Sequence, residues 1–420
     1  MKRFASVCLT LILSHCISIA QDKDTISYMH YNLLQYGNYF GGCTVSNNNV
    51  ADKDGYLKTI IDATLPDIFT VNEMRVNNVY ARRIVQNSLN QSGRSNYEQA
   101  TFSFNGSSDI CNMLFYNKDK IGLISQDFID EGVNNSSLTR RVDVYNLYYK
   151  DAFLSSHKDT VKFSVFVCHL NAGNASRRAI EAEAIADYIS SNNMKGNYLL
   201  GGDLNIDRST SQAYQNLVLN GDYSLIDPID QDGSWSSNSS FKAIHTQSTR
   251  TSGGCAAGGG MDDRFDFILI SNDVKDDSSG VVYIDDSYEA MGQDGLRYNQ
   301  SLISPPNNTY SSDVISALYE MSDHLPVIVK LAVDKRDLTS LDAPSVSWNH
   351  RFQNRHLIIS QSKNQAVYLR IYNLNGQVLF YEKKSSTKVD FDYSKLGDKM
   401  LLFEFGIESE KPKFVKRFRN

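Results

Sequence analysis

The sequence has few prolines, no cysteine pair with metal-binding spacing and no long apolar run after residue 20. Its 7 prolines and 25 glycines in 420 residues are modest numbers and indicate no long structureless linker. The absence of CxxC and CxxH spacing disfavours a zinc site built on thiolates. Because a membrane-spanning helix needs roughly 18 or more apolar residues, none is predicted after residue 20. With 41% hydrophobic and 21% charged residues, the composition is that of a globular protein.

The sequence also lacks an excess of positive charge. Residues 22–334 contain 24 basic and 39 acidic residues, a net charge of −15, whereas the residues from 335 onward carry +7. A protein that holds nucleic acid mainly by neutralising phosphates is basic. Either divalent cations therefore bridge the acidic segment to an anionic substrate, or the substrate is small. We interpret the net positive charge of the residues from 335 onward as a solvated face of that segment.

The first twenty residues predict a targeting segment. Two basic residues precede an apolar run at 4–12, and Ser-Ile-Ala at 18–20 forms a small-residue cleavage site. We expect cleavage after Ala20 and export, so that the protein is secreted or lies at the cell surface without a permanent membrane span. A membrane anchor and a lipid-modified Cys16 are the alternatives.

Export would leave four cysteines, which allow three pairings. Cys111 and Cys168 lie in apolar strand-like runs, where a free cysteine behaves as a small hydrophobe. Cys43 and Cys255 lie in small-residue loops, the better setting for a disulfide in an oxidising compartment. The hypothesis is a Cys43–Cys255 bridge.

Apolar periodicity divides the chain into two domains. Between 22 and 334, strand-like and helix-like runs alternate, which predicts sheets with helices outside them. The predicted strands are 26–34, 67–73, 97–104, 110–117, 138–149, 163–170, 197–203, 264–271 and 324–333, and the predicted helices are 52–65, 79–91 and 175–191. Turn residues without periodicity at 335–349 predict a linker. Residues 350–420 contain short strand-like runs only, which predict a small β-sandwich. We expect a monomer.

Several polar side chains stand at or beside the ends of apolar strands. These candidate site residues are Asn32, Glu73, His169, Asp203, Asn205, Asp266, Asp323 and His324. Taken singly, each is more often a turn residue or a hydrogen-bonded structural group. Placed together, acidic groups are costly without a cation to offset their repulsion. Carboxylate and amide oxygens suit Mg²⁺, Mn²⁺ or Ca²⁺, and histidines with carboxylates supply the proton-handling groups that phosphate-ester cleavage needs.

A series of short motifs runs along the chain, in the order N-L, E, H-L, G-D-L-N, R-F-D-F-I and S-D-H-L-P-V. This series resembles that of the endonuclease/exonuclease/phosphatase superfamily. The resemblance covers roughly residues 26–333, and His169 favours the deoxyribonuclease- and sphingomyelinase-like branch. It implies an α/β fold, a four-layered α/β sandwich of two mixed β-sheets flanked by helices, with the small C-terminal β-sandwich added.

The same resemblance implies a metal site and roles for its residues. Glu73 is implied as the principal ligand of Mg²⁺, with Mn²⁺ or Ca²⁺ as alternatives. Asn32 is implied beside it, in contact with the metal or the phosphate, and Asp323 is implied to complete the metal environment.

The catalytic residues are implied in the same way. Asp203 is expected to orient or deprotonate the attacking water, and Asn205 to hold phosphate and metal. His324 is expected to contact a phosphate oxygen, oriented and charged by Asp266, and His169 is a further catalytic residue. The charge that builds on phosphate oxygens during in-line attack is the physical reason for these residue types.

Flanking segments are expected to shape specificity. The Gly-rich run 251–263 lacks the GxxxxGK[ST] form, so a nucleotide P-loop is not predicted. Aromatic residues of 284–321 are candidates to stack on bases or to meet a lipid headgroup, although loop packing explains any single one of them. These are Tyr288, Tyr298 and Tyr310. Arg140 or Arg141 is a candidate accessory phosphate contact.

The C-terminal segment, with LRIYNLNGQVLFYEKK and the basic end FVKRFRN, resembles the sorting domain of the bacterial type IX secretion system. This resemblance implies the type IX secretion machinery as a partner. The alternative is an accessory β-domain that binds a surface or a glycan.

The sequence therefore predicts a secreted, divalent-metal-dependent phosphodiesterase, with an extracellular nuclease acting on DNA or RNA as the first hypothesis. A phosphatase or sphingomyelinase-type phospholipase is the second. The third, from another class, is an inactive binding or adhesion protein on the same fold.

Overall fold

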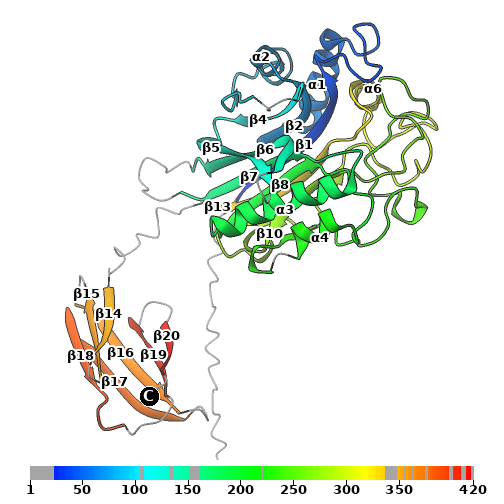
Figure 1. Ribbon diagram of the computed structural model, residues 1–420. Coiled ribbons are helices and arrows are strands. Elements are labelled where there is room, and N and C mark those ends of the chain that lie inside the picture. The colour runs from blue at the N-terminus through cyan, green and yellow to red at the C-terminus, as the bar shows by residue number, and fades with distance from the viewer. Residues whose placement is uncertain are drawn as a thin grey trace, which may run out of the picture. The chain divides into compact units, whose positions relative to one another are not determined.

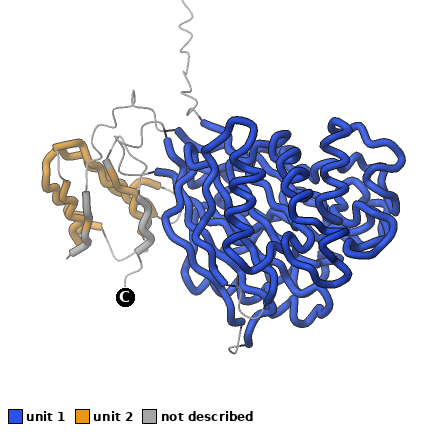
Figure 2. The backbone as a smooth tube through the Cα atoms, turned by 90° about the horizontal axis from the view of Figure 1, so that it is seen from above, with its two compact units in different colours: residues 1–337 blue, residues 338–420 orange. Residues whose placement is uncertain are grey.

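The computed structural model describes most of the chain, which forms two compact units, residues 1–337 and 338–420 (Figure 2). The described residues are 23–104, 108–132, 136–151, 160–219, 221–335, 348–353, 355–361, 364–373, 377–396, 401–407 and 413–417. The predicted targeting segment and most of the predicted linker lie outside them. No helix among these residues is long and apolar enough to cross a membrane.

The first unit contains two mixed sheets. The first sheet has the strand order β11-β13-β1-β2-β4-β3, with β12 beside β13. Its strands are β1 (Lys23–Tyr36), β2 (Ile68–Arg75), β3 (Tyr97–Gln99), β4 (Ile110–Asn117), β11 (Val281–Tyr283), β12 (Glu289–Ala290) and β13 (Val327–Asp334). The second sheet has the order β5-β6-β7-β8-β10-β9. Its strands are β5 (Ile121–Gly132), β6 (Ser136–Tyr149), β7 (Lys162–His169), β8 (Asn197–Asp203), β9 (Leu225–Ile226) and β10 (Asp266–Ser271).

Helices flank both sheets. They are α1 (Val50–Thr64), α2 (Asn78–Ile84), α3 (Ala175–Ser191), α4 (Gln212–Val218), α5 (Asn272–Asp276) and α6 (Ser312–Met321). In Figure 1, α1, α2 and α6 accompany the first sheet, and α3 and α4 accompany the second. Buried apolar residues of α3 and α4 pack against β7, β8 and β10. The unit is thus the expected four-layered α/β sandwich.

The two glycines that precede Asp203 let β8 pack closely against its neighbours. A Cβ added at Gly201 would lie 1.9 Å from the hydroxyl of Tyr28 in the facing sheet, and one at Gly202 would lie 2.4 Å from the carbonyl of Cys168 in β7. Only glycine fits at such close approaches. This packing fixes where β8 ends and therefore where the carboxylate of Asp203 lies.

The strongest periodic patterns predicted the elements best. The helix at 175–191 and the strands at 110–117 and 197–203 have the predicted bounds. The prediction of a strand over 97–104 was too long, because β3 ends at Gln99. The helix predicted over 79–91 begins at Asn78 and continues from Val85 to Leu89 as a π-helix.

Several elements were missed or misplaced. The sequence predicted no strand at β5, where some apolar residues are exposed, and no helix at α4, which has few apolar positions. It also predicted no helix at α6, which lies in a segment interpreted as a loop. The last predicted strand begins at Val327 rather than at residue 324, because His324 and Leu325 bond instead to the loop at Thr246 and Gln247.

A disulfide links Cys43 and Cys255, which confirms the pairing that the sequence favours. Cys111 and Cys168 are free and buried, also as expected. The bridge joins the loop after β1 to the Gly-rich loop, so two segments 212 residues apart in sequence lie side by side at one end of the sandwich.

The second unit is a small β-sandwich. One antiparallel sheet has the order β14-β15-β18, and the other has the order β17-β16-β19-β20. The strands are β14 (Trp348–Gln353), β15 (His356–Gln361), β16 (Ala366–Tyr372), β17 (Val378–Ser385), β18 (Lys388–Asp392), β19 (Leu401–Ile407) and β20 (Lys413–Arg417). Alternate residues of both sheets, including Ile359, Leu369 and Phe391, bury one shared core. Strands β14 and β15 were not predicted.

Candidate active site

Register places three predicted site residues side by side in the second sheet. In the parallel pair of β7 and β8, His169 lies opposite Asp203. In the antiparallel pair of β8 and β10, Asp266 lies opposite the same Asp203. Since β8 lies between β7 and β10, these ends form a row of histidine and two carboxylates. All three side chains are buried.

The first sheet contributes Asn32 and Glu73 through an irregularity in its strands. Asn32 of β1 pairs with Asn72 of β2, but the next pair is Tyr36 with Met74, so three residues of β1 oppose Glu73 alone. Glu73 itself has a left-handed φ of 59°. Bulges and left-handed residues of this kind re-aim side chains and concentrate next to active sites.

The two sheets bring together two groups of ligating side chains. Glu73, His169 and Asp203 each offer an atom within 4.8 Å of the others, and so do Asp203, Asp266 and His324. Nε2 of His169 lies 4.0 Å from Oε1 of Glu73 and 3.5 Å from Oδ2 of Asp203. Asp203 belongs to both groups and is thus the centre of the cluster.

Asn32, predicted beside the metal, donates hydrogen bonds to the two carboxylates. Its amide nitrogen lies 3.1 Å from Oε1 of Glu73 and 3.0 Å from Oδ2 of Asp203. Its amide oxygen accepts from the backbone N–H of Leu34 at 3.0 Å. In this arrangement the amide nitrogen of Asn32 positions the two carboxylates.

Asp203 is held by donors from both sides. Its Oδ2 accepts from Asn32, and its Oδ1 accepts from the backbone N–H of Asn205 at 3.0 Å. Burial raises the pKa of Asp203, although nearby His324 opposes this shift, and the carboxylates of Asp266 and Glu73 raise it further. A buried carboxylate with a raised pKa is suited to accept a proton near neutral pH.

His324 forms a buried ion pair with Asp266. Its Nδ1 lies 2.7 Å from Oδ2 of Asp266, and its Nε2 lies 3.7 Å from Oδ2 of Asp203. Burial alone would lower the pKa of His324, but these carboxylates raise it well above its usual value. The side-chain amide of Gln247 places its nitrogen 2.7 Å from Nε2 of His324. Its oxygen must face the ring when His324 is protonated, because two N–H groups cannot share a hydrogen bond.

His169 has the opposite electrostatic character. Burial lowers its pKa well below the usual value, and the positive charges of Arg140 and His324 lower it further. Its Nδ1 is buried without a hydrogen-bond partner among the described residues. A neutral imidazole beside two carboxylates has a lone pair available for a cation, so His169 fits the ligand group better than a proton-donating role.

Two predicted residues have other contacts. Asn205, with a left-handed φ of 50°, uses its side-chain nitrogen to bond the carbonyl of Leu170 at 3.1 Å. Asp323, predicted as a metal ligand, accepts from the backbone N–H of Ala257 at 2.6 Å and belongs to neither ligand group. Its other oxygen, Oδ1, is buried without a partner among the described residues. The structure thus places Asp323 beside the cluster as a support of the Gly-rich loop.

A cavity of about 290 Å³ opens beside Glu73 and His169, and we call it the Glu73 cavity. Arg140 lines it and donates to the carbonyls of His169 and Leu170, both at 2.8 Å. The guanidinium of Arg141 instead lies 3.5 Å from the ring centre of Phe128. Of the two arginines that the sequence left open, Arg140 is therefore the one that faces the site.

Sequence reasoning missed two other residues of the Glu73 cavity. Gln35 donates to Oε2 of Glu73 through both its backbone N–H and its side chain, at 3.0 Å each. Phe40 is 71% exposed at the cavity wall, on the loop that the disulfide anchors. In the sequence, these two residues were marked only by their position shortly after the predicted strand 26–34, which contains Asn32.

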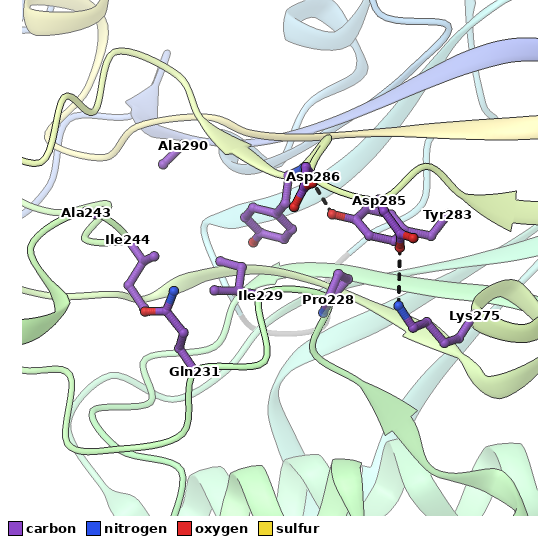
Figure 3. A pocket seen from close by; sticks show the side chains of 11 residues that line it. Pro228, Ile229, Gln231, Ala243, Ile244, Lys275, Tyr283, Asp285, Asp286 and Ala290 are labelled. Carbon is purple, nitrogen blue, oxygen red and sulfur yellow. Dashed lines mark hydrogen bonds and ion pairs between the residues drawn. The ribbon is translucent and has the colours of Figure 1, made fainter.

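A larger cavity of about 610 Å³ is lined by other residues, which Figure 3 shows. Its charged residues include Lys275 and Asp285, which pair at 3.3 Å. Tyr288, a predicted stacking residue, lines this cavity, and its hydroxyl accepts from the backbone N–H of Ile268. No member of the two ligand groups lines the larger cavity. The Glu73 cavity, in turn, is lined by none of the predicted stacking residues Tyr288, Tyr298 and Tyr310.

The donor set fits a divalent cation. Two carboxylates and a neutral imidazole converge from three strands, and hydrogen bonds from neutral groups such as Asn32 and Gln35 offset part of the repulsion between the carboxylates. Carboxylate oxygens are the ligands that hard divalent cations prefer. Glu73 would hold such an ion with His169, beside Asp203, and the ion would neutralise charge that develops on a phosphoryl group.

This fold and site define a class of protein, the phosphoric ester hydrolases. The sequence profile of the Endonuclease/Exonuclease/phosphatase family matches residues 29–324. The chain therefore belongs to this family, whose members use divalent metals, and it is an enzyme that hydrolyses phosphoric esters. A comparison with curated proteins found no match to the sequence.

Solved structures with a similar fold are remote in sequence. A family member from Bacteroides thetaiotaomicron is 14% identical, with a TM-score of 0.47, over 74% of this chain and 99% of that one. Zebrafish TDP2 in complex with a single-stranded DNA product is 12% identical, with a TM-score of 0.46, over 73% and 98%. A mannosyl-6-phosphatase from B. thetaiotaomicron is 14% identical, with a TM-score of 0.45, over 73% and 99%.

Proposed function

We propose that this protein is a secreted, Mg²⁺-dependent phosphodiesterase and, most specifically, an extracellular nuclease that hydrolyses DNA or RNA. The observation that supports the reaction is the central position of Asp203. Its carboxylate lies in one group with Glu73 and His169 and in another with Asp266 and His324. A proton acceptor therefore lies between a candidate cation site and a charged hydrogen-bond donor.

Each of these residues has its own role in the proposed reaction. Asp203 accepts a proton from the water that attacks phosphorus, and its raised pKa suits this transfer near neutral pH. Protonated His324 donates a hydrogen bond to a phosphate oxygen, and Asp266 keeps that histidine oriented and charged. Arg140 contacts the phosphate from the Glu73 cavity. A bound Mg²⁺ would supply the charge stabilisation that the net negative site lacks.

Phe40 favours a nucleic acid as the substrate. Its ring is 71% exposed although it borders the Glu73 cavity, and a disulfide anchors its loop to the Gly-rich loop. Exposed aromatic rings next to phosphate-binding groups bind nucleobases by stacking, which contributes about 1–3 kcal/mol per base. This arrangement suits a phosphodiester whose neighbouring base rests on the Phe40 ring.

A small phosphate monoester or a lipid headgroup is the second candidate substrate. The cavity beside Glu73 holds only about 290 Å³, and residues 22–334 carry a net charge of −15, which disfavours a long polyanion. Both features are compatible with a phosphatase or a sphingomyelinase-type phospholipase.

Export through the type IX secretion machinery is part of the proposal. The Cys43–Cys255 disulfide is consistent with an oxidising compartment, and residues 350–420 resemble the sorting domain of that system. The protein recovered from culture medium should begin at Gln21. An N-terminal sequence that still contains residues 1–20 would contradict the proposed cleavage.

A substrate panel tests the catalytic proposal. Purified protein is assayed with Mg²⁺ or with EDTA on plasmid DNA, RNA, sphingomyelin, a phosphoinositide and a sugar phosphate. We expect cleavage of nucleic acid with Mg²⁺ and its loss in EDTA, because a cation must offset the charges of Glu73, Asp203 and the substrate. Cleavage of another ester alone would replace the nuclease proposal with the second candidate. Equal rates with and without chelator would refute metal dependence.

The Phe40→Ala variant extends the same panel. Loss of stacking should raise KM for nucleic acid by about tenfold, which is near the lower end of the range for one base, with little change for a small phosphodiester that has no base. Leu219→Ala is the matched control, because Leu219 is also exposed, at 69%, and lies outside the Glu73 cavity. An unchanged KM in the Phe40 variant would remove the support that this residue gives to a nucleic acid substrate.

A further inference from the structure

Lys53 of α1 is buried and has no acidic partner in contact among the described residues. Its side chain belongs to a residue only 2% exposed. Its Nζ donates to the backbone carbonyls of Leu33 at 2.8 Å and Leu34 at 2.5 Å. Among the described residues, no carboxylate oxygen lies within 4.0 Å of this ammonium. Burial lowers the pKa of Lys53 to about 7 against the attraction of Asp323 and Glu73, so the charge is costly to place there.

The carbonyls that Lys53 holds belong to an unfavourable piece of backbone. Leu34 and Gln35 are consecutive left-handed residues, with φ of 44° and 55°, and neither is glycine. Such residues persist only where surrounding contacts over-determine them. The side chain of Asn48 supplies two more contacts, donating to the carbonyls of Leu34 at 3.2 Å and Gln35 at 3.0 Å.

This turn determines the orientation of the Glu73 carboxylate. It is the segment of β1 in which three residues oppose Glu73 alone. The turn directs both N–H donors of Gln35 to Oε2 of Glu73, each at 3.0 Å. With Oε2 bound in this way, Oε1 is the oxygen that lies near His169 and Asn32.

We infer that Lys53 is a positioning residue for the divalent cation: by holding the carbonyls of Leu33 and Leu34, it keeps Gln35 in place to orient Glu73. The inference rests on the metal dependence in the proposed function. Groups that orient ligands in this indirect way typically change metal affinity by about 10–100-fold when removed.

The test is Mn²⁺ binding to the intact, substrate-free protein, measured by isothermal titration calorimetry. Lys53→Met should weaken Mn²⁺ binding by about tenfold or more, while far-ultraviolet circular dichroism shows the fold retained. Lys58→Met is the matched control, because Lys58 lies on the same helix and pairs with Asp62 at its outer face. That control should bind Mn²⁺ as the unmodified protein does. Unchanged affinity in folded Lys53→Met would overturn the inference.

A second variant covers the case in which Lys53→Met does not fold. Asn48→Ala removes the other donor to the same turn and should also weaken Mn²⁺ binding, by several-fold. Unchanged affinity in Asn48→Ala would then overturn the inference.

A double variant tests the route through Gln35. If Lys53 acts on Glu73 by way of Gln35, the effects of Lys53→Met and Gln35→Ala on Mn²⁺ affinity should be clearly less than multiplicative. A general loss of stability would give no such coupling. Multiplicative effects would refute the route.

The outcomes also separate this inference from the proposed function. Absence of Mn²⁺ binding to the unmodified protein would refute the metal site itself. Tight binding in the unmodified protein with equal binding in Lys53→Met would refute only the role of Lys53.

Discussion

Replacing Asp203 with asparagine should lower turnover by at least about 10²-fold, the contribution typical of a general base. The carboxylate lies between the pair of Glu73 and His169 and the pair of Asp266 and His324. Asparagine keeps the volume and one oxygen, so one of the two hydrogen bonds from Asn32 and Asn205 can be retained. What is lost is the negative charge and the ability to accept a proton from water.

The measurement is kcat on the preferred substrate, with thermal unfolding as the check on structure. Asp207→Asn is the matched control, since Asp207 is four residues further on and its side chain pairs with exposed Arg208. The control should keep the unmodified rate. A turnover within a fewfold of the unmodified enzyme in Asp203→Asn would rule out a proton-accepting role for this residue.

The second large effect concerns the buried pair of His324 and Asp266. We expect His324→Ala to lower turnover by at least about 10²-fold and Asp266→Asn to move the pH dependence. In the unmodified enzyme the carboxylates hold the pKa of His324 well above its usual value, so activity that needs the charged ring falls only as pH rises through that high pKa. Without the Asp266 charge the pKa of His324 drops, and the alkaline fall of kcat must occur at lower pH.

A pH–rate profile of each variant checks this shift. Asp285→Asn is the control, because it also removes one carboxylate, and Asp285 pairs with Lys275 at the larger cavity. Its profile should match that of the unmodified enzyme. An alkaline limb of Asp266→Asn at the same pH, or at a higher one, would show that Asp266 does not keep His324 charged.

Much of the fold was predictable where a local pattern was strong. The strands that end in Asp203 and His169 are almost wholly apolar, because β7 and β8 lie inside the second sheet with buried residues on both faces. The helix at 175–191 has a clear apolar stripe. Helix α6 was missed because it lies within a long segment of polar and turn residues, although its own apolar face is buried against the rest of the unit.

The arrangement of the candidate site was only partly predictable. The residue types around Asp203 and His324 were recognisable from their motifs. The orientation of each side chain was not, because it depends on contacts between segments far apart in the chain. Asn32 turns its nitrogen to the carboxylates since Leu34 N–H takes its oxygen, and Asp323 turns to Ala257. Gln35 and Phe40 have no motif at all.

By itself, the sequence determined the class of chemistry, since acids, amides and histidines followed apolar strands in an order that few families share. It also determined the layered architecture, because alternating strand and helix periods can bury their apolar faces only in stacked layers. Only the tertiary structure decided which of these polar groups meet. The register of β7, β8 and β10 and the bulge opposite Glu73 join residues that lie far apart in the sequence. No local pattern encodes such distances, because they follow from how whole sheets pack.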